Sequence, residues 1–352
     1  MKKFLMGVSV AALALGAVGA SFAQDVESVC LVTDKGKIND GTFNQYAYEG
    51  MARAVEDFDI DSTYIETQSE ADYEANINTC VEQGYDIIVT VGFLIADATK
   101  AAAEANPEVY FIGVDQFLAD GPTNYVGIQF REDQAGFLVG ALAALVAEEA
   151  GGDTIAGVYG IDIPPVVKFR NGYEQGARYI NPELNILGKY EDSFVAPDKG
   201  ASTARTFIEE GAVVIFGAGG PTGSGAIAEA AKAGVYVIGV DQDEYFTTFG
   251  SGETEGAEFL ISSAQKAVDV GVYDMIAALV EGDMEAFIGG SNYILDVANG
   301  GITFAPKHDA DLADELYAQV EEIKQMLIDG ELETGVDPAS GELVVPEATT
   351  TP

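Results

Sequence analysis

The chain has almost no histidine, no tryptophan and few basic residues. Its 352 residues include one histidine, His308, and 17 lysines and arginines against 58 aspartates and glutamates, for a net charge of −41. One histidine argues against a zinc site and against a Ser-His-Asp triad. The shortage of positive charge excludes a nucleic-acid-binding surface and disfavours anionic lipid and phosphorylated ligands. The composition favours a neutral or cationic ligand, although we expect adaptation to a salty habitat to be the main cause of the acidity.

Cysteine is also scarce. Cys30 and Cys80 are the two cysteines of the chain, and they lack metal-ligand spacing. Cys30 lies on the first predicted strand and Cys80 lies late in a helix that should cross over it. In an oxidising compartment such a pair invites a bridge. A disulfide and two buried free thiols both remain open.

Long apolar runs are missing except at the N-terminus. Lys2 and Lys3 precede an apolar stretch from Phe4 to Ala20, and Ala23 ends a small-x-small cleavage site. The stretch is short and rich in alanine and glycine, which disfavours a membrane anchor. Residues 1–23 are therefore predicted to be a cleavable signal peptide. There is no cysteine beside the cleavage site, so nothing suggests a lipid anchor. The mature chain would be extracytoplasmic, with 15 basic and 58 acidic residues and a net charge of −43.

One phrase occurs twice. Phe111 to Gln116 reads Phe-Ile-Gly-Val-Asp-Gln, and Val237 to Gln242 repeats it with one change, at an offset of 126 residues. Each copy is a short apolar run that ends in Asp-Gln, which is typical of a buried strand with a polar tip. Ligands bind beyond the carboxyl ends of parallel strands. Asp115 and Asp241 should therefore face a shared cleft, while chance similarity is the weaker explanation.

Strands alternate with predicted helices of about ten residues or more, which indicates an α/β chain with parallel sheets. We expect two lobes with helices on each sheet, and chain crossings near Phe130, Glu244 and Phe287. The predicted division is 24–130 plus 245–286 for lobe 1, 131–244 plus 287–335 for lobe 2, and 336–352 for a disordered tail. One helix is predicted from Ser262 to Glu281, with Lys266 on its first turn.

Catalytic patterns are weak. His308 lies in a polar turn far along the chain from any strand tip, so we expect it at the surface. The glycine-rich loop from Gly217 to Gly225 lacks both the dinucleotide fingerprint and a phosphate-loop lysine. It either lets backbone amides approach a ligand or is a merely permissive turn. Phe43 and Phe194 lie in loops that should face the cleft, either as stacking platforms or as core residues.

A resemblance adds to these patterns. The opening segment Val32 to Gly50 resembles the signature of the basic membrane protein (BMP) family, and the blocks around Asp115, Phe194, Asp241 and Lys266 look like later family segments. The likeness extends to about residue 330. It implies a two-lobed periplasmic-binding-protein (type I) fold and a substrate-binding protein of an ABC importer.

The resemblance also implies a ligand site for a purine nucleoside or a similar small molecule. Phe43 and Phe194 would stack on the base, Asn44 and Asp115 would bind its edge, and Asp241, Lys266 and backbone near Gly219 would hold the ribose. The expected ligand-binding residues are Asp34, Phe43, Asn44, Asp115, Phe194, Gly217, Gly219, Asp241 and Lys266.

The resulting hypothesis is a monomeric periplasmic receptor that is not an enzyme, holds no cofactor or metal, and has an ABC permease as its partner. Family members are often lipoproteins, and this chain departs from them because it lacks the lipidation cysteine. A ligand-sensing subunit of a membrane receptor is the main alternative. A nucleoside hydrolase lacks clustered catalytic carboxylates, and a sugar-responsive repressor would need a basic DNA-binding head.

Overall fold

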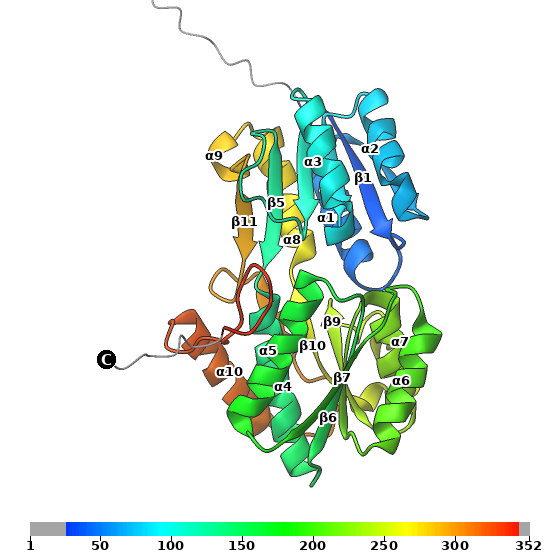
Figure 1. The fold of residues 1–352 in the computed structure, drawn as a ribbon, viewed down its shortest axis with the longest axis vertical. Helices are drawn as coiled ribbons and strands as arrows, with labels where there is room; N and C mark the ends of the chain where they lie inside the picture. Colours follow the sequence, from blue (N-terminus) through cyan, green and yellow to red (C-terminus); the bar gives the residue numbers. More distant parts are fainter. Residues whose placement is uncertain (1–25, 345–352) are drawn as a thin grey trace, which may run out of the picture.

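The computed structural model describes residues 26–344 and forms two α/β lobes, one above the other in Figure 1. The predicted signal peptide, residues 1–23, lies outside the described residues. Within the described range no helix has both the length and the apolar character that crossing a membrane requires.

The first lobe is built on a six-stranded sheet. Its strands are β1 (Ser28–Lys35), β2 (Asp61–Thr67), β3 (Ile87–Val91), β4 (Tyr110–Val114), β5 (Tyr125–Phe130) and β11 (Asn292–Leu295). Its helices are α1 (Phe43–Phe58), α2 (Tyr73–Glu82), α3 (Ala96–Ala105), α8 (Val268–Val280) and α9 (Met284–Phe287). Short 3-10 helices span Glu70–Asp72 and Phe93–Ile95. The strand order is β11-β5-β4-β3-β1-β2, and all neighbours are parallel. The central strand β3 is buried at every position and apolar except for Thr90, as expected when helices cover both faces.

The second lobe repeats this plan. Its strands are β6 (Thr154–Tyr159), β7 (Asn185–Tyr190), β8 (Val214–Ala218), β9 (Tyr236–Asp241), β10 (Leu260–Lys266) and β12 (Ile302–Phe304). Its helices are α4 (Glu132–Glu149), α5 (Pro164–Ile180), α6 (Pro197–Glu209), α7 (Gly220–Lys232) and α10 (Asp314–Ile328). Two more 3-10 helices span Gly250–Gly252 and Ala257–Phe259. The order β12-β10-β9-β8-β6-β7 matches that of the first lobe, with β12 antiparallel to β10.

The internal repeat extends further than the sequence indicated. β10 occupies in the second sheet the place that β5 has in the first, so the repeat does not stop at Asp241. The connection from β9 to β10 covers residues 242–259, whereas that from β4 to β5 covers 115–124. The longer connection breaks the constant offset, and this hid the later part of the repeat.

The predicted helix from Ser262 to Glu281 is wrong in its first part. Leu260–Lys266 is a buried strand, and the helix α8 begins at Val268. The polar side chains that obscured the strand pattern are satisfied inside the lobe. The Ser262 hydroxyl donates to the Ala305 carbonyl at 2.8 Å, and the Ser263 hydroxyl oxygen accepts from the Glu244 N–H at 3.1 Å. Lys266 therefore ends a strand.

The predicted division into lobes needs two corrections. The segment 245–286 was assigned to lobe 1, but its strand β10 belongs to the second sheet, and 287–335 was assigned to lobe 2, but β11 belongs to the first sheet. The chain crosses directly after β5, directly after β10 and between β11 and β12, so only the crossing at Phe130 was placed correctly.

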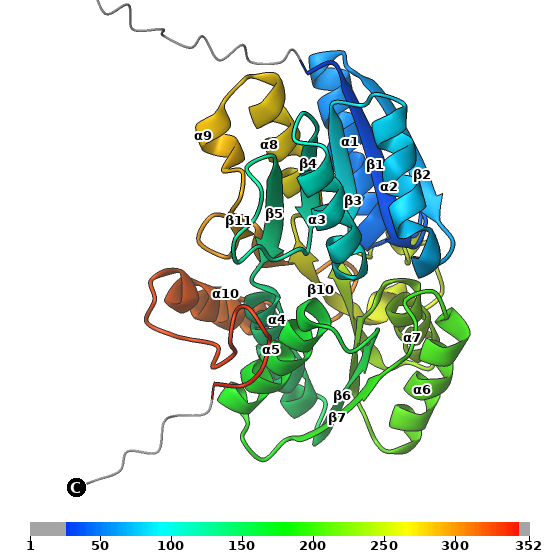
Figure 2. The ribbon, with the colours of Figure 1, turned by 45° about the horizontal axis from the view of Figure 1, so that its top comes forward.

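The reason for these positions is an exchange of helices between the lobes. After β5 the chain enters the second lobe, where α4 packs on α5, and after β10 it returns to the first lobe, where α8 packs on α1 (Figure 2). The first two crossings thus each follow the fifth strand of a sheet, and the third joins the edge strands β11 and β12.

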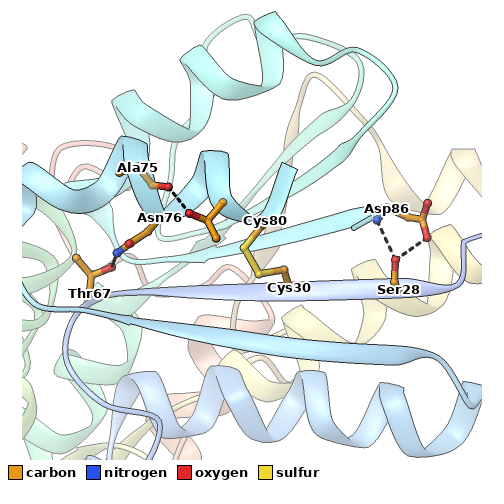
Figure 3. The surroundings of a disulfide bond; sticks show 8 residues. Ser28, Cys30, Thr67, Ala75, Asn76, Cys80 and Asp86 are labelled. Carbon is orange, nitrogen blue, oxygen red and sulfur yellow. Dashed lines mark hydrogen bonds between the residues drawn. A yellow bond between two sulfur atoms is a disulfide. The ribbon is translucent and has the colours of Figure 1, made fainter. Parts of the chain in front are cut away.

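Cys30 of β1 and Cys80 of α2 form a disulfide that ties the helix to the sheet (Figure 3). Both residues are fully buried. Toward the start of β1, the Ser28 hydroxyl donates to the Asp86 carboxylate at 2.8 Å and fixes the entry into β3. The bridge therefore lies in a part of the lobe that is also held by hydrogen bonds.

The predicted disorder of residues 336–352 is wrong for residues 336–344. Val336 pairs with Leu343 in an antiparallel bridge, and the Asp337 carboxylate accepts hydrogen bonds from the backbone N–H groups of Ala339 and Ser340. A tight turn of this kind needs no hydrophobic periodicity, which is why the composition suggested disorder. Residues 345–352 lie outside the described range.

Candidate functional site

A cavity lies between the lobes at the carboxyl ends of both sheets. It contains about 600 Å³ of space not filled by atoms, its open mouth included. Both lobes contribute to its lining. The residues are Asp34, Lys35, Asp40, Phe43, Asn44, Gly92, Phe93, Asp115, Ile163, Pro165, Val166, Phe169, Phe194, Ala218, Gly219, Gly220, Pro221, Val240, Asp241 and Lys266.

Asp115 and Asp241, the two repeated aspartates, both reach this cavity. Their backbone φ angles are 61° and 65°, a left-handed conformation that is uncommon outside glycine. Such strain persists where the surrounding structure fixes it and gathers at ligand sites. The same unusual conformation occurs at equivalent positions of the two lobes. We infer that it has the same purpose in both, which is to direct the carboxylate into the cleft.

The glutamines that follow these aspartates fix the two turns differently. Gln116 Nε2 donates to the Gly92 carbonyl at 2.9 Å, within its own lobe. Gln242 Nε2 instead donates to the Thr42 carbonyl at 2.9 Å, across the cleft. The second copy of the phrase therefore also forms a contact between the lobes.

Lys266 forms the most heavily charged contact of the site. Its ammonium lies 2.7 Å from Asp115 Oδ2 and 2.8 Å from Glu132 Oε1, and all three side chains are buried. Burial alone would lower the pKa of Lys266, but the carboxylates outweigh it and raise that pKa. Lys266 thus stays charged and links the first lobe to the start of α4. The ammonium charge of Lys266 also attracts the Asp241 carboxylate, which forms no ion pair with it.

Asp34 and Asp241 have no ion-pair partner among residues 26–344. Burial raises the pKa of Asp34 to about 7 against the hydrogen bond from Asn44, and burial raises the pKa of Asp241 to about 7 against the attraction of Lys266. Burial also raises the pKa of Asp115, although Lys266 opposes it. The Asp115 Oδ1 atom is buried and makes no hydrogen bond within the described residues. These oxygens need donors, which a ligand with hydroxyl or N–H groups would supply.

Aromatic rings line the cavity from both lobes. Phe43 begins α1, and Phe194 lies in the loop before α6. A Cβ atom on Gly160 would lie 2.2 Å from the Phe194 ring, so the glycine makes room for the ring. Lys266 Nζ lies 5.0 Å from the Phe43 ring centroid, in the range of a cation–π contact. The Phe43 ring therefore contacts the charged group of Lys266, and the Phe194 ring lies against the backbone at Gly160.

Gly217 does not line the cavity, which corrects its assignment as a ligand-binding residue. It lies in β8, where a Cβ would come within 2.5 Å of the Gly223 carbonyl oxygen, so its role is to let α7 pack closely on the strand. Gly219 does line the cavity. The glycine-rich segment is mostly helical, because α7 begins at Gly220 and not near Gly225. At the start of α7, Pro221 has no N–H and the Thr222 N–H donates to the Phe194 carbonyl at 3.0 Å, so of these first residues only Gly220 could offer its N–H to the cavity.

Asp34 and Asn44 reach the cavity as predicted, and Asp40 joins them. Asp40 Oδ1 accepts from the Thr42 N–H at 2.9 Å, and Asn44 Nδ2 donates to Asp40 Oδ2 at 3.1 Å. Asp40 thereby orders the loop that precedes α1 and orients Asn44. The Asn44 Oδ1 atom is buried and makes no hydrogen bond to any described residue.

Sequence reasoning missed two parts of the site. Glu132, the partner of Lys266, lies two residues after β5, and the available signal was an acidic residue at the start of a helix whose middle is apolar. The first turn of α5 supplies an apolar wall formed by Ile163, Pro165, Val166 and Phe169. Only the folded chain brings these neighbours opposite the first lobe.

The single histidine lies outside the residues that line the cavity. His308 is partly buried, its Nε2 atom lies 2.7 Å from Asp243 Oδ2, and its ring stacks on Tyr245. Within residues 26–344 no group of histidine, cysteine and acidic side chains has an arrangement that could hold a metal ion.

The sequence matches one family over most of its length. The sequence profile of the family described as "ABC transporter substrate-binding protein PnrA-like" matches residues 27–336. The chain is 32% identical to a CD4+ T-cell-stimulating antigen of Listeria monocytogenes, over 88% of each chain. It is 29% identical to the ABC transporter nucleoside-binding protein BmpA of Lactococcus lactis subsp. cremoris, over 94% of this chain and 99% of that protein.

Two further similarities bear on anchoring and on the fold. An uncharacterized lipoprotein of Pyrococcus abyssi is 30% identical over 79% of this chain and 70% of its own length. A crystal structure of solute-binding proteins of an ABC transporter system from Aeropyrum pernix K1 superimposes with a TM-score of 0.76. The identity is 28%, over 87% of this chain and 92% of that one.

Proposed function

Because the chain belongs to the family of PnrA-like ABC transporter substrate-binding proteins, we propose that its cleft captures a purine nucleoside and that the loaded protein delivers it to an ABC permease. The observation that carries the proposal is the composition of the cavity, which combines a phenylalanine from each lobe with carboxylates from both lobes. A flat base with a polyhydroxylated sugar satisfies both features. The name of the Lactococcus relative, a nucleoside-binding protein, supports this ligand class.

The electrostatics of the cavity support a neutral ligand over a phosphorylated one. Asp34, Asp115 and Asp241 all line the cavity, and both lysines that line it are already paired. Lys266 is shared between Asp115 and Glu132, and Lys35 pairs with Glu70. A phosphate group would meet uncompensated negative charge in a buried site. Hydroxyl and ring N–H groups would instead donate to the carboxylate oxygens and meet no such repulsion.

The roles of individual residues follow from this ligand. Phe43 and Phe194 would hold the base between them, while Asn44, Asp34 and Asp115 would read its edge. Asp241, Lys266 and the backbone at Gly219 would bind the sugar. A buried polar group left without its partner opposes binding strongly, so these side chains should discriminate against nucleobases that lack a sugar.

The decisive test of the site is calorimetric titration of guanosine and inosine into the Phe43→Ala and Asp241→Ala variants. Loss of a buried charged hydrogen-bond partner costs about 2–5 kcal/mol, so the Kd of Asp241→Ala should rise at least about 30-fold. Phe43→Ala should also lose measurable binding, because the base loses one of its two platforms.

The matched controls are Tyr64→Ala and Asp311→Ala, which remove an exposed aromatic ring and an exposed carboxylate away from the cavity. Both should bind as the unaltered protein does. Circular dichroism must show that all four variants are folded. If Phe43→Ala and Asp241→Ala keep their affinity for nucleosides, the site assignment is wrong.

For location, we propose that residues 1–23 are removed at Ala23 and that the mature protein is a monomer that diffuses in the periplasm without a lipid. The residue directly after the predicted cleavage site is Gln24 and not a cysteine, whereas a Pyrococcus relative is named a lipoprotein. Intact mass measurement of the protein from a periplasmic extract should give the unmodified chain starting at Gln24. A lipid-modified or membrane-bound product would contradict this.

A further inference from the structure

The chain after α10 folds into a small hairpin against the second lobe (Figure 1, red). Val336 pairs with Leu343, and the Val344 N–H donates to the Gly335 carbonyl at 2.9 Å. The Asp337 carboxylate closes the turn by accepting from the Ser340 N–H at 2.7 Å. Residues 334–344, termed the C-terminal clasp, thus hold their own shape.

One end of the clasp is attached to the first crossing between the lobes. The buried Thr334 hydroxyl donates to Asp133 Oδ2 at 2.5 Å. Asp133 is fully buried and also forms a two-pronged pair with Arg131, with both N–O distances at 2.8 Å. The Arg131 N–H donates to the Leu295 carbonyl at 2.9 Å, so this group also reaches the end of β11. Asp133, the partner of Thr334, therefore lies where two of the three crossings between the lobes come together.

The other end of the clasp rests on the first turns of α5. The Gly341 carbonyl accepts from Asn171 Nδ2 at 2.7 Å. A Cβ on Gly341 would lie 2.8 Å from the Lys168 backbone N and 3.0 Å from the Pro164 carbonyl oxygen. The tip of the hairpin is thus in direct contact with the helix backbone.

The turn of α5 that receives the clasp also forms the apolar wall of the cavity. Pro165, Val166 and Phe169 line the cavity. Lys168, in the same turn, donates to the Phe130 carbonyl at 2.9 Å and pairs with Glu132 at 2.5 Å. Glu132 in turn pairs with Lys266. A continuous set of contacts therefore joins the clasp, the cavity wall and the charged cluster.

We propose that the C-terminal clasp is a positioning element of the binding site. By holding Asp133 at the crossing and Gly341 against α5, it fixes the apolar wall of the cavity and thereby slows release of the ligand. Thr334 and Gly341 act through the residues they touch and do not contact the ligand themselves. The effect on ligand release rests on the proposed function, whereas the effect on the wall does not.

A matched pair of glycine substitutions tests the contact with α5. Gly341→Ala and Gly330→Ala both place a side chain at a left-handed position, with φ of 82° and 69°, but only Gly341 has backbone atoms in the way. Hydrogen exchange of the ligand-free protein, measured over residues 163–171, should be at least about tenfold faster in Gly341→Ala than in Gly330→Ala. Equal exchange in the two variants would overturn the proposal.

Thr334→Val tests the other attachment, because it removes the hydroxyl and keeps the shape of the side chain. Its control is Thr206→Val, which removes a hydroxyl that bonds only within α6. Thr334→Val should also speed exchange over residues 163–171, and guanosine should leave both clasp variants at least about threefold faster, at an unchanged association rate. Faster exchange with unchanged release would contradict the proposal. If the unaltered protein binds no nucleoside, the proposed function fails, and exchange alone decides whether the clasp holds the wall.

Discussion

Asp241 ends its strand fully buried, with a carboxyl group whose charge has no adjacent cation. Lys266, the nearest source of positive charge, is engaged by Asp115 and Glu132. Burial consequently raises the pKa of Asp241 to about 7. A ligand that donates a hydrogen bond to this group would compensate for its burial. In the ligand-free protein, ionisation of this buried carboxyl group should lower the free energy of unfolding as the pH rises.

This expectation has a definite sign. The pKa of Asp241 is about 7 in the folded protein and has a reference value of 3.8, so between these values the folded state binds more protons than the unfolded state. The free energy of unfolding should therefore fall as pH rises from 4 to 7. This one group contributes up to about 1.4 kcal/mol per pH unit.

The measurement is urea unfolding of the ligand-free protein at several pH values, compared with Asp241→Asn. The unaltered protein should lose stability relative to Asp241→Asn as pH increases through that range. Asp311→Asn, at an exposed position, is the control and should follow the unaltered protein. Parallel curves for the unaltered protein and Asp241→Asn would contradict the assigned environment.

At this scale the sequence identified the residues that a motif or a repeat marks. Phe43, Asn44 and Asp34 lie in a recognisable opening segment, and Asp115 and Asp241 lie in a repeated phrase. Glu132 and Phe169 could not be found in the same way, because their place in the cavity depends on how α4 and α5 pack. Gly217 was misplaced because a glycine needed for helix packing looks the same in sequence as one needed for a ligand.

Among the elements, the disulfide joins β1 and α2 within the first lobe. Cys30 and Cys80 are separated by 50 residues, and closing a loop of that size stabilises the folded state by about 4 kcal/mol in the chain-entropy model. Neither cysteine lines the cavity. The bridge should therefore matter for stability and not for ligand affinity.

The double variant Cys30→Ala/Cys80→Ala tests this division of roles. Its free energy of unfolding should fall by about 4 kcal/mol relative to the oxidised protein, and its Kd for nucleoside should stay within about twofold. Reduction of the unaltered protein with dithiothreitol is the matching experiment. A marked loss of affinity in the folded double variant would show that the bridge also shapes the cavity.

The elements that the sequence predicted well are those with strong periodicity. The sequence pattern predicts a helix over 43–58 and strands over 125–130 and 185–190, and these form at those bounds as α1, β5 and β7. Strand β10 was taken for a helix because Ser262, Ser263 and Lys266 interrupt its apolar pattern. Their polar groups find partners only in the folded lobe, so no local signal identifies them.

At the scale of the whole molecule, the two lobes are held together across the cavity as well as by the crossings. Lys266 of the second sheet bonds Asp115 of the first, and Gln242 bonds the Thr42 carbonyl. Both contacts start from segments that also line or border the cavity. A ligand in the cleft would add further bonds to each lobe, so binding and closure should reinforce one another.

The central claim is that the cleft takes a whole nucleoside. It is tested most directly by a thermal-shift screen of the refolded, ligand-stripped protein against nucleosides, free bases, ribose, other sugars and amino acids. A ligand at 100 times its Kd adds about 2.7 kcal/mol of stability, so guanosine, inosine or adenosine should raise the melting temperature by several degrees. Guanine and ribose alone should not, because each satisfies only one half of the cavity. No shift with any nucleoside, together with a clear shift with a different small molecule, would contradict the claim.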